Sequence, residues 1–220
     1  MIIYHGSVNI VEIPVFGLGK KHNDYGQGFY CTEDIDLARE WACQSPNGGF
    51  CNMYELDTDM LSICELDEHN IIEWLALLLD NRTIRYSSPI ERVSAEYVIS
   101  HFLPDISGYD VIKGYRADDS YFSFARAFLS NAISYHQLSD ALKFGELGIQ
   151  VCLKSEKSFD LIRFVEARPV DGSIYYPRRT ARDLEARKAY DRSLESESID
   201  GIYIRDIIRE EMKIDELRIQ

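Results

Sequence analysis

The sequence lacks the patterns that mark several large classes of protein. No Cys-x-x-Cys pair occurs among its five cysteines, so zinc-type spacing is absent and we expect no metal site. No stretch reaches the apolar length of a membrane span, and the first residues, MIIYHGSVNIVEIPV, lack the basic and apolar regions of a signal peptide. We therefore expect reduced, mostly buried thiols in a cytoplasmic protein that does not associate with a membrane.

Positive charge is also scarce, since 24 Lys and Arg stand against 37 Asp and Glu and the net charge is −13. A generic acidic surface repels phosphate backbones, so non-specific nucleic-acid binding is not expected. A small anionic ligand held by backbone N–H groups stays compatible with this charge. The segment Gly17-Leu18-Gly19-Lys20 has neither the spacing nor the hydroxyl of a Walker loop, and no G-x-S-x-G or H-E-x-x-H motif occurs.

What is present is enough apolar sequence, 45% of 220 residues, for one ordinary globular domain with a core. Apolar periodicity predicts strands at 1–5, 28–32, 51–57, 109–116, 149–155 and 163–170. It predicts helices at 35–43, 69–80, 90–101, 120–132, 138–144 and 178–196, a helical turn at 155–162, and a strand followed by a helix at 199–213. Thr32 or Asp34 is in position to cap the first helix. The irregular alternation favours an α+β fold over a doubly wound sheet.

Three short segments could carry chemistry, although each alone favours a structural role. They are His5-Gly6-Ser7 at the end of the first strand, Gly26-Gln27-Gly28-Phe29-Tyr30 followed by Ala38 and Trp41, and Gln150-Val151-Cys152-Leu153 on a late strand. Their order and spacing resemble the H-Y-E class of ADP-ribosyltransferases, which includes the catalytic domains of poly(ADP-ribose) polymerases. The resemblance implies the fold of that superfamily, a split mixed β-sheet with an NAD cleft and helical insertions.

A closer resemblance is to an uncharacterised bacterial family of domains of unknown function, family 3990. This resemblance covers about residues 2–167. The shared marks are YHGS, the GxGFYxT run with its later Ala and Trp-Ala, the Trp74-Leu75 and Asn81-Arg82 pairs, YDVIKGYRADD and the late Gln-Val strand. We accordingly expect a catalytic domain over 1–170 with helical insertions at about 66–104 and 118–147. Residues 171–220 are expected to form a charged C-terminal extension that packs on the same domain.

The resemblance to the H-Y-E class implies roles for the motif residues around NAD⁺. The backbone of Gly6 would pair with the nicotinamide carboxamide, because only a residue without Cβ lets the backbone come so close. His5 would bond the adenosine-side ribose, and Ser7 another hydroxyl of the dinucleotide. Tyr30, on the strand that begins at Gly28, would sandwich the cationic nicotinamide ring with Trp41. His5, Tyr30 and Gln150 would form the catalytic set.

Two positions depart from that class. Gln150 occupies the place of the catalytic glutamate, so it can bond the ribose 2′-hydroxyl but offers no negative charge. We expect no polymer elongation, and Asp118, Asp119 and Glu146 are candidates, in that order, for a substituting carboxylate. Ala38 stands where the polymerases have a serine that bonds the carboxamide, a loss of about 1 kcal/mol.

The implied function is mono-ADP-ribosyl transfer from NAD⁺ to a macromolecule with release of nicotinamide. Similar domains act as toxins in toxin–antitoxin or phage-defence systems, which implies a small antitoxin protein as a partner. The acidic surface favours a protein acceptor over nucleic acid. Two alternatives stay open: a catalytically degenerate module that binds NAD⁺ or ADP-ribose, and an NAD⁺ glycohydrolase.

Overall fold

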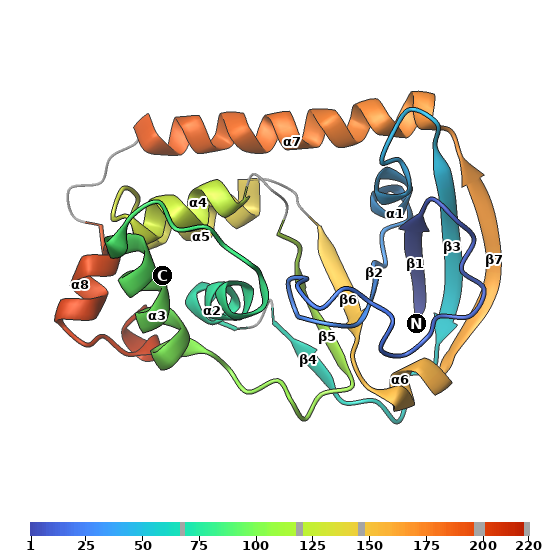
Figure 1. The fold of residues 1–220 in the computed structure, drawn as a ribbon, viewed down its shortest axis with the longest axis horizontal. Helices are drawn as coiled ribbons and strands as arrows, with labels where there is room; N and C mark the ends of the chain where they lie inside the picture. Colours follow the sequence, from blue (N-terminus) through green and yellow to red (C-terminus); the bar gives the residue numbers. More distant parts are fainter. Residues whose placement is uncertain (67–68, 118–120, 145–147, 196–200, 218–220) are drawn as a thin grey trace. The chain divides into compact units, whose positions relative to one another are not determined.

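The computed structural model describes residues 1–66, 69–117, 121–144, 148–195 and 201–217. The chain divides into two compact units. Unit 1 comprises Met1–Leu66, Asp105–Arg116 and Gly148–Arg182, and unit 2 comprises Asp67–Pro104, Ala117–Leu147 and Asp183–Gln220. Over the described residues the chain forms two β-sheets and eight α-helices (Figure 1), which confirms the expected α+β class.

Unit 1 holds both sheets. The first has the strand order β1 (Ile2–Ser7), β3 (Gly49–Leu56) and β7 (Ile162–Val170), with antiparallel neighbours. The second has the order β2 (Phe29–Cys31), β6 (Ile149–Leu153), β5 (Val111–Tyr115) and β4 (Ile63–Glu65), with only the β4–β5 pair parallel. A single bridge between Tyr4 and Thr32 joins β1 to β2 through hydrogen bonds of 2.7 and 2.9 Å. Among the described residues, this pair provides the backbone-to-backbone bridge between the two sheets.

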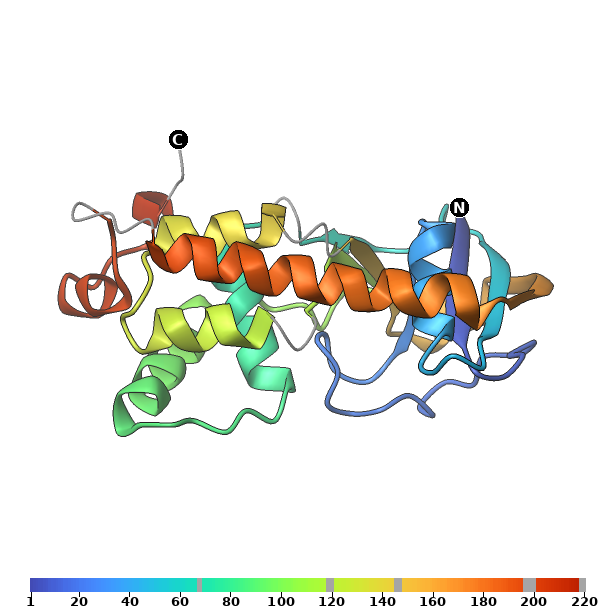
Figure 2. The same cartoon turned by 90° about the horizontal axis from the view of Figure 1, so that it is seen from above.

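The core of unit 1 comes from the strand positions that alternate toward one face of each sheet. Its buried members are Ile3, Cys31, Tyr54, Leu56, Val111, Val151 and Leu153. Helix α1 (Ile35–Ala42) begins after Asp34, whose side chain accepts from two backbone N–H groups of the first turn. The cap is therefore Asp34, while Thr32 donates its hydroxyl to the carbonyl of Ile149. Figure 2 shows α1 lying beside β1.

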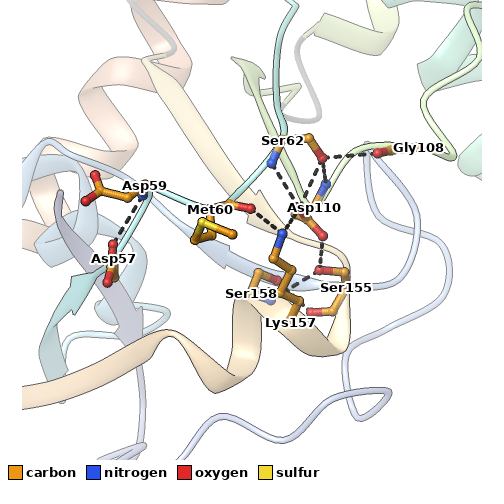
Figure 3. Close-up of polar contacts among 9 residues, drawn as sticks. All are labelled: Asp57, Asp59, Met60, Ser62, Gly108, Asp110, Ser155, Lys157 and Ser158. Carbon is orange, nitrogen blue, oxygen red and sulfur yellow. Dashed lines mark hydrogen bonds and ion pairs between the residues drawn. The ribbon is translucent and has the colours of Figure 1, made fainter.

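A polar cluster around Asp110 fixes the ends of the second sheet (Figure 3). Its carboxylate accepts from the hydroxyl of Ser155 at 2.6 Å and from the N–H and hydroxyl of Ser62 at 2.9 and 3.1 Å. Lys157, on helix α6 (Glu156–Asp160), places its Nζ 3.6 Å from the same carboxylate. These contacts, led by the Ser155 hydrogen bond, lower the pKa of Asp110 to about 2. The cluster joins the starts of β4, β5 and α6.

Unit 2 is helical. Its elements are α2 (Ile71–Asn81), α3 (Pro89–Phe102), α4 (Tyr121–Leu129), α5 (Tyr135–Phe144), α8 (Ile204–Arg209) and a 3₁₀ helix at Ile214–Leu217. A capping box of Asn70 and Glu73 starts α2, whose apolar residues are almost all buried. Trp74 of α2 packs edge-on against Tyr121 with ring centroids 4.5 Å apart. The residues predicted as insertions thus supply a separate apolar core.

Helix α7 (Gly172–Glu195) begins six residues before the predicted start at 178, so that boundary is wrong. Asp171 explains the earlier start, because its side chain accepts from Ser173 and its carbonyl from the N–H of Tyr175. Pro177 therefore lies inside the helix rather than at its beginning. The helix crosses the boundary at Arg182, so residues 171–220 divide between the two units.

Further details differ from the sequence prediction. Helix α5 begins at Tyr135 rather than at 138, because Ser134 accepts from the N–H of Gln137 and caps it. The strand β4 was not predicted. The strand predicted before the last helix is absent from residues 201–203, the part of that segment that the structure describes, and the carbonyl of Ile202 instead accepts from the N–H of Tyr135. Over the described residues, no helix combines the length and the apolar character that a membrane span requires.

Candidate functional site

His5 lies where β1 and β2 diverge, directly after the Tyr4–Thr32 bridge. Its Nδ1 is 2.7 Å from the carbonyl oxygen of Tyr30, so Nδ1 carries the proton and donates. Burial lowers the pKa of His5, and the hydrogen bond to Tyr30 only partly opposes this effect. The imidazole is therefore neutral near pH 7, and its Nε2 is an acceptor available to a hydroxyl group.

Gly6 is fixed by the packing of helix α1. A Cβ on this residue would lie 1.9 Å from the carbonyl oxygen of Ala38 and 2.8 Å from the Cβ of Trp41. Alternate residues of an antiparallel strand direct their amide groups to opposite edges. Tyr4 bonds Thr32 on the β2 side, so the N–H and C=O of Gly6, two residues later, face the same side. Glycine is thus required by α1, and its backbone faces the gap between the strands.

Ser7 is held by a buried residue that the sequence analysis missed. Asn52, on β3, donates its Nδ2 to the carbonyl of His5 and to the hydroxyl of Ser7, both at 3.0 Å. Its Oδ1 accepts from the N–H of Val11 at 2.9 Å. The Ser7 hydroxyl in turn donates to the carbonyl of Asn9 at 2.6 Å. Asn52 therefore fixes the His5–Ser7 segment and the start of the loop that follows.

Tyr30 uses its hydroxyl to organise a turn. The hydroxyl donates to the carbonyl of Gly26 at 2.7 Å and accepts from the N–H of Tyr25 at 3.0 Å. Burial is the main reason why the pKa of Tyr30 is raised, so the phenol stays protonated. At Gly28, a Cβ would lie 2.5 Å from the Sγ of Cys152. Gly28 thus permits the close approach of β2 to β6.

Trp41 packs beside Gly6 and faces a cation. The guanidinium of Arg116 lies 5.5 Å from the centre of the Trp41 ring, within the range of a cation–π contact. The indole Nε1 is buried without a hydrogen-bond partner in the described part of the chain. Tyr30 and Trp41 do not stack on each other: the ring of Tyr30 stacks on Tyr25, at 6.4 Å. The Trp41 ring therefore already contacts a cation, the guanidinium of Arg116.

Gln150 is paired with a carboxylate. Its Nε2 donates to Oδ2 of Asp24 at 2.9 Å and to the carbonyl of Tyr115 at 3.2 Å. Both Gln150 and Asp24 are only 4% exposed. In β6, Gln150 lies two residues before Cys152, which is opposite Tyr30, so the Tyr30 and Gln150 side chains share a face of the second sheet. The first motif contacts the second through the Tyr30 carbonyl and through Phe29, whose ring lies 4.5 Å from that of His5, and the third shares a sheet face with the Tyr30 side chain.

A family profile described as protein of unknown function (DUF3990) matches residues 1–164, about three quarters of the chain. The chain belongs to the DUF3990 family. The matched residues include His5, Tyr30 and Gln150. Neither the search of curated proteins nor the search of solved structures returned a match.

The three carboxylates proposed to substitute for glutamate, Asp118, Asp119 and Glu146, lie outside the described residues of this DUF3990 chain. The carboxylate that does contact Gln150 is Asp24, 126 residues away in sequence. Its only sequence signal is its place in a Gly-rich loop before the Gly26–Tyr30 motif. That signal gives no reason to pair it with Gln150.

A separate cavity of about 220 Å³ opens on the other side of β1 in this DUF3990 chain. It is lined by Tyr4, Ile35, Arg39, Cys51, Met53, Glu166 and Arg168. Arg39 lies 2.8 Å from Asp36, and Arg168 lies 2.6 Å from Glu166. Both cations are thus compensated, and Tyr4 points to the opposite face from its neighbour His5. The cavity therefore contains none of the predicted site residues.

Proposed function

We propose that this chain is an NAD⁺-dependent mono-ADP-ribosyltransferase that transfers ADP-ribose to a macromolecule and releases nicotinamide. The observation that carries the proposal is the convergence of the three motifs. His5 bonds the backbone of Tyr30, and Tyr30 shares a sheet face with Gln150. The division into two sheets that are bridged by backbone hydrogen bonds at Tyr4 and Thr32 also agrees with the split sheet expected for an ADP-ribosyltransferase fold.

The residues present suit the parts of NAD⁺. The N–H and C=O of Gly6 face the gap between the strands, where they can pair with a carboxamide. Trp41 already accepts the cation of Arg116 on its ring, and a positively charged nicotinamide suits the same surface. The neutral imidazole of His5 can accept from a ribose hydroxyl through Nε2.

The reaction breaks the bond between the ribose C1′ and the nicotinamide nitrogen, and the bonding electron pair leaves with nicotinamide. The electron-poor C1′ then forms a bond to a nucleophilic atom of the acceptor, which loses its proton to water. Gln150 can accept from the ribose 2′-hydroxyl but carries no charge. We therefore expect transfer of a single ADP-ribose rather than polymer elongation.

The acceptor and the setting follow from charge and from the family resemblance. With a net charge of −13, an acidic enzyme favours a protein acceptor over nucleic acid. A cytoplasmic toxin that modifies host proteins needs a neutralising partner, and we expect a small antitoxin protein in that role. Labelling of a bacterial lysate with radioactive NAD⁺, followed by protease or nuclease treatment, identifies the class of acceptor.

The direct test is nicotinamide release by the purified protein from NAD⁺, with and without lysate. We expect release by the wild type and loss of release in His5→Ala. His136→Ala is the matched control, because His136 is an exposed histidine on α5 of unit 2. Release with labelled macromolecules supports transfer, whereas release without them indicates a glycohydrolase. NAD⁺ binding without release indicates a binding module, and neither binding nor release would contradict the proposal.

A further inference from the structure

The orientation of the Gln150 amide is dictated by its two neighbours. A carboxylate and a backbone carbonyl only accept hydrogen bonds, so they must face Nε2 with its two hydrogens. The flipped amide would place three acceptors together and leave both hydrogens without these partners. Gln150 Oε1 therefore points away from Asp24 and from the carbonyl of Tyr115.

That oxygen has no hydrogen-bond partner among the described residues, although the residue is only 4% exposed. The oxygen is not among the fully buried side-chain atoms that lack a partner, so it lies at the accessible edge of an otherwise buried residue. Because both hydrogens of Nε2 are used within the protein and Oε1 is accessible, the side chain can accept a hydrogen bond from a donor outside the chain. A hydroxyl group of a bound sugar is such a donor.

The turn that carries Asp24 is held firmly on both sides. Tyr25 donates its hydroxyl to the carbonyl of Tyr115 at 2.5 Å, and its own carbonyl accepts from Nζ of Lys154 at 2.5 Å. The N–H of Tyr25 and the carbonyl of Gly26 both bond the hydroxyl of Tyr30. The tyrosine of the second motif therefore fixes the loop that places the carboxylate of Asp24 against Gln150.

We propose that Asp24 is a positioning residue: it locks the Gln150 amide so that Oε1 accepts from the ribose hydroxyl of NAD⁺. This inference rests on the proposed transferase function. A carboxylate that accepts from Nε2 also polarises the amide, so Oε1 becomes a stronger acceptor. Asp24 thereby lends negative charge to a site whose glutamate is replaced by glutamine, and negative charge stabilises the cationic transition state.

The first test compares Asp24→Asn with Asp105→Asn, an exposed aspartate in unit 1. The amide oxygen introduced by Asp24→Asn can still accept from Gln150, so the variant should fold, but the charge is lost. We expect the kcat of nicotinamide release to fall by about 10- to 100-fold in Asp24→Asn, with KM nearly unchanged and Asp105→Asn like the wild type. An unchanged kcat in Asp24→Asn would overturn the inference.

The second test exchanges the two side chains. Gln150→Glu alone places a carboxylate against Asp24 and the carbonyl of Tyr115, so we expect lower thermal stability and no gain in kcat. The double variant Asp24→Asn/Gln150→Glu restores a donor–acceptor pair in the opposite sense and should recover at least the wild-type kcat. Full activity of Gln150→Glu by itself would show that Asp24 has no role.

A third readout separates this inference from the proposed function. The side-chain amide protons of Gln150, followed by NMR, should shift in Asp24→Asn and again when NAD⁺ binds the wild type. If the wild type neither binds NAD⁺ nor releases nicotinamide, the transferase proposal fails and this inference fails with it. If the wild type is active but its Gln150 signals and kcat are insensitive to Asp24→Asn, only this inference fails.

Discussion

Buried polar side chains play different roles in the two units. In unit 2 the fully buried examples cap helices of their own segment, since Gln137 accepts from the N–H of Ser134 and Glu91 from the N–H of Ser87, three and four residues away. The half-buried Asn70 of the same unit also donates to the carbonyl of Leu217, 147 residues away. In unit 1 the buried polar side chains join distant segments, since the Gln150–Asp24 bond spans 126 residues and the Thr32–Ile149 bond spans 117. Local bonds end a helix, whereas long-range bonds bring strands and loops together at one place.

Local caps and long-range polar bonds place different demands on the fold. A cap needs one residue and its own backbone, so it can form on any helix. A long-range buried polar bond must also offset the loss of chain entropy and of hydration, which tertiary packing has to supply. Unit 1 contains several such bonds around His5, Tyr30 and Gln150. Matched substitutions in the two units test whether long-range buried hydrogen bonds contribute more to the free energy of unfolding than local helix caps do.

The largest effect is expected for Asn52→Ala. The change leaves the buried N–H of Val11 without its acceptor and removes the donor to the carbonyl of His5. We expect a loss of about 2–3 kcal/mol in the free energy of unfolding, measured by urea denaturation, together with slower nicotinamide release. The matched control is Gln137→Ala in unit 2, which removes a local cap and should cost about 1 kcal/mol without changing release. Equal losses of unfolding free energy in the two variants would contradict this comparison.

A smaller effect is expected for Asp110→Asn, since Asp110 is partly exposed and its partners are close to the surface. Its pKa of about 2 lies below the ordinary value of 3.8, so the folded state binds the proton more weakly than the unfolded chain. The stabilisation is therefore present above about pH 4 and is lost as the pH falls toward about 2. We expect Asp110→Asn to lower stability by about 1 kcal/mol at neutral pH.

The measurement for Asp110 is thermal unfolding of the wild type and Asp110→Asn between pH 7 and pH 2. The difference between the two should shrink as the pH falls. Asp59→Asn, an exposed neighbour in the same region, is the control and should follow the wild type (Figure 3). A difference that stays constant with pH would mean that the charge of Asp110 contributes nothing.

The sequence predicts those parts of the molecule that depend on local patterns. The helix after Asp34 and the helix over 71–81 follow from apolar periodicity and capping residues. The start of α7 was placed at 178, whereas the cap at Asp171 determines it. The three-residue strand β4 is too short to show a period, and its partner β5 lies 48 residues further along the chain.

For the candidate site too, the sequence shows local motifs but not long-range contacts. His5, Tyr30 and Gln150 were selected by a resemblance of motifs. In unit 1, His5 bonds the Tyr30 carbonyl, and the Gln150 and Tyr30 side chains share a sheet face. Asp24 and Asn52 were not selected, because their importance lies in partners 126 and 47 residues away and neither residue type nor spacing indicates those partners. Residues that support a site through long-range contacts become visible only once the fold is known.

The central claim is that NAD⁺ binds among the motif residues of unit 1, and the two tryptophans allow a direct test. Trp41 lies in unit 1 and Trp74 in unit 2, so Trp74→Phe and Trp41→Phe each leave one reporter. Titration with NAD⁺ should quench the fluorescence of Trp41 saturably in Trp74→Phe, and His5→Ala added to that variant should abolish the effect. Trp74, the reporter in Trp41→Phe, should not respond. An unresponsive Trp41, or an equal change in both variants after correction for absorption, would contradict the account.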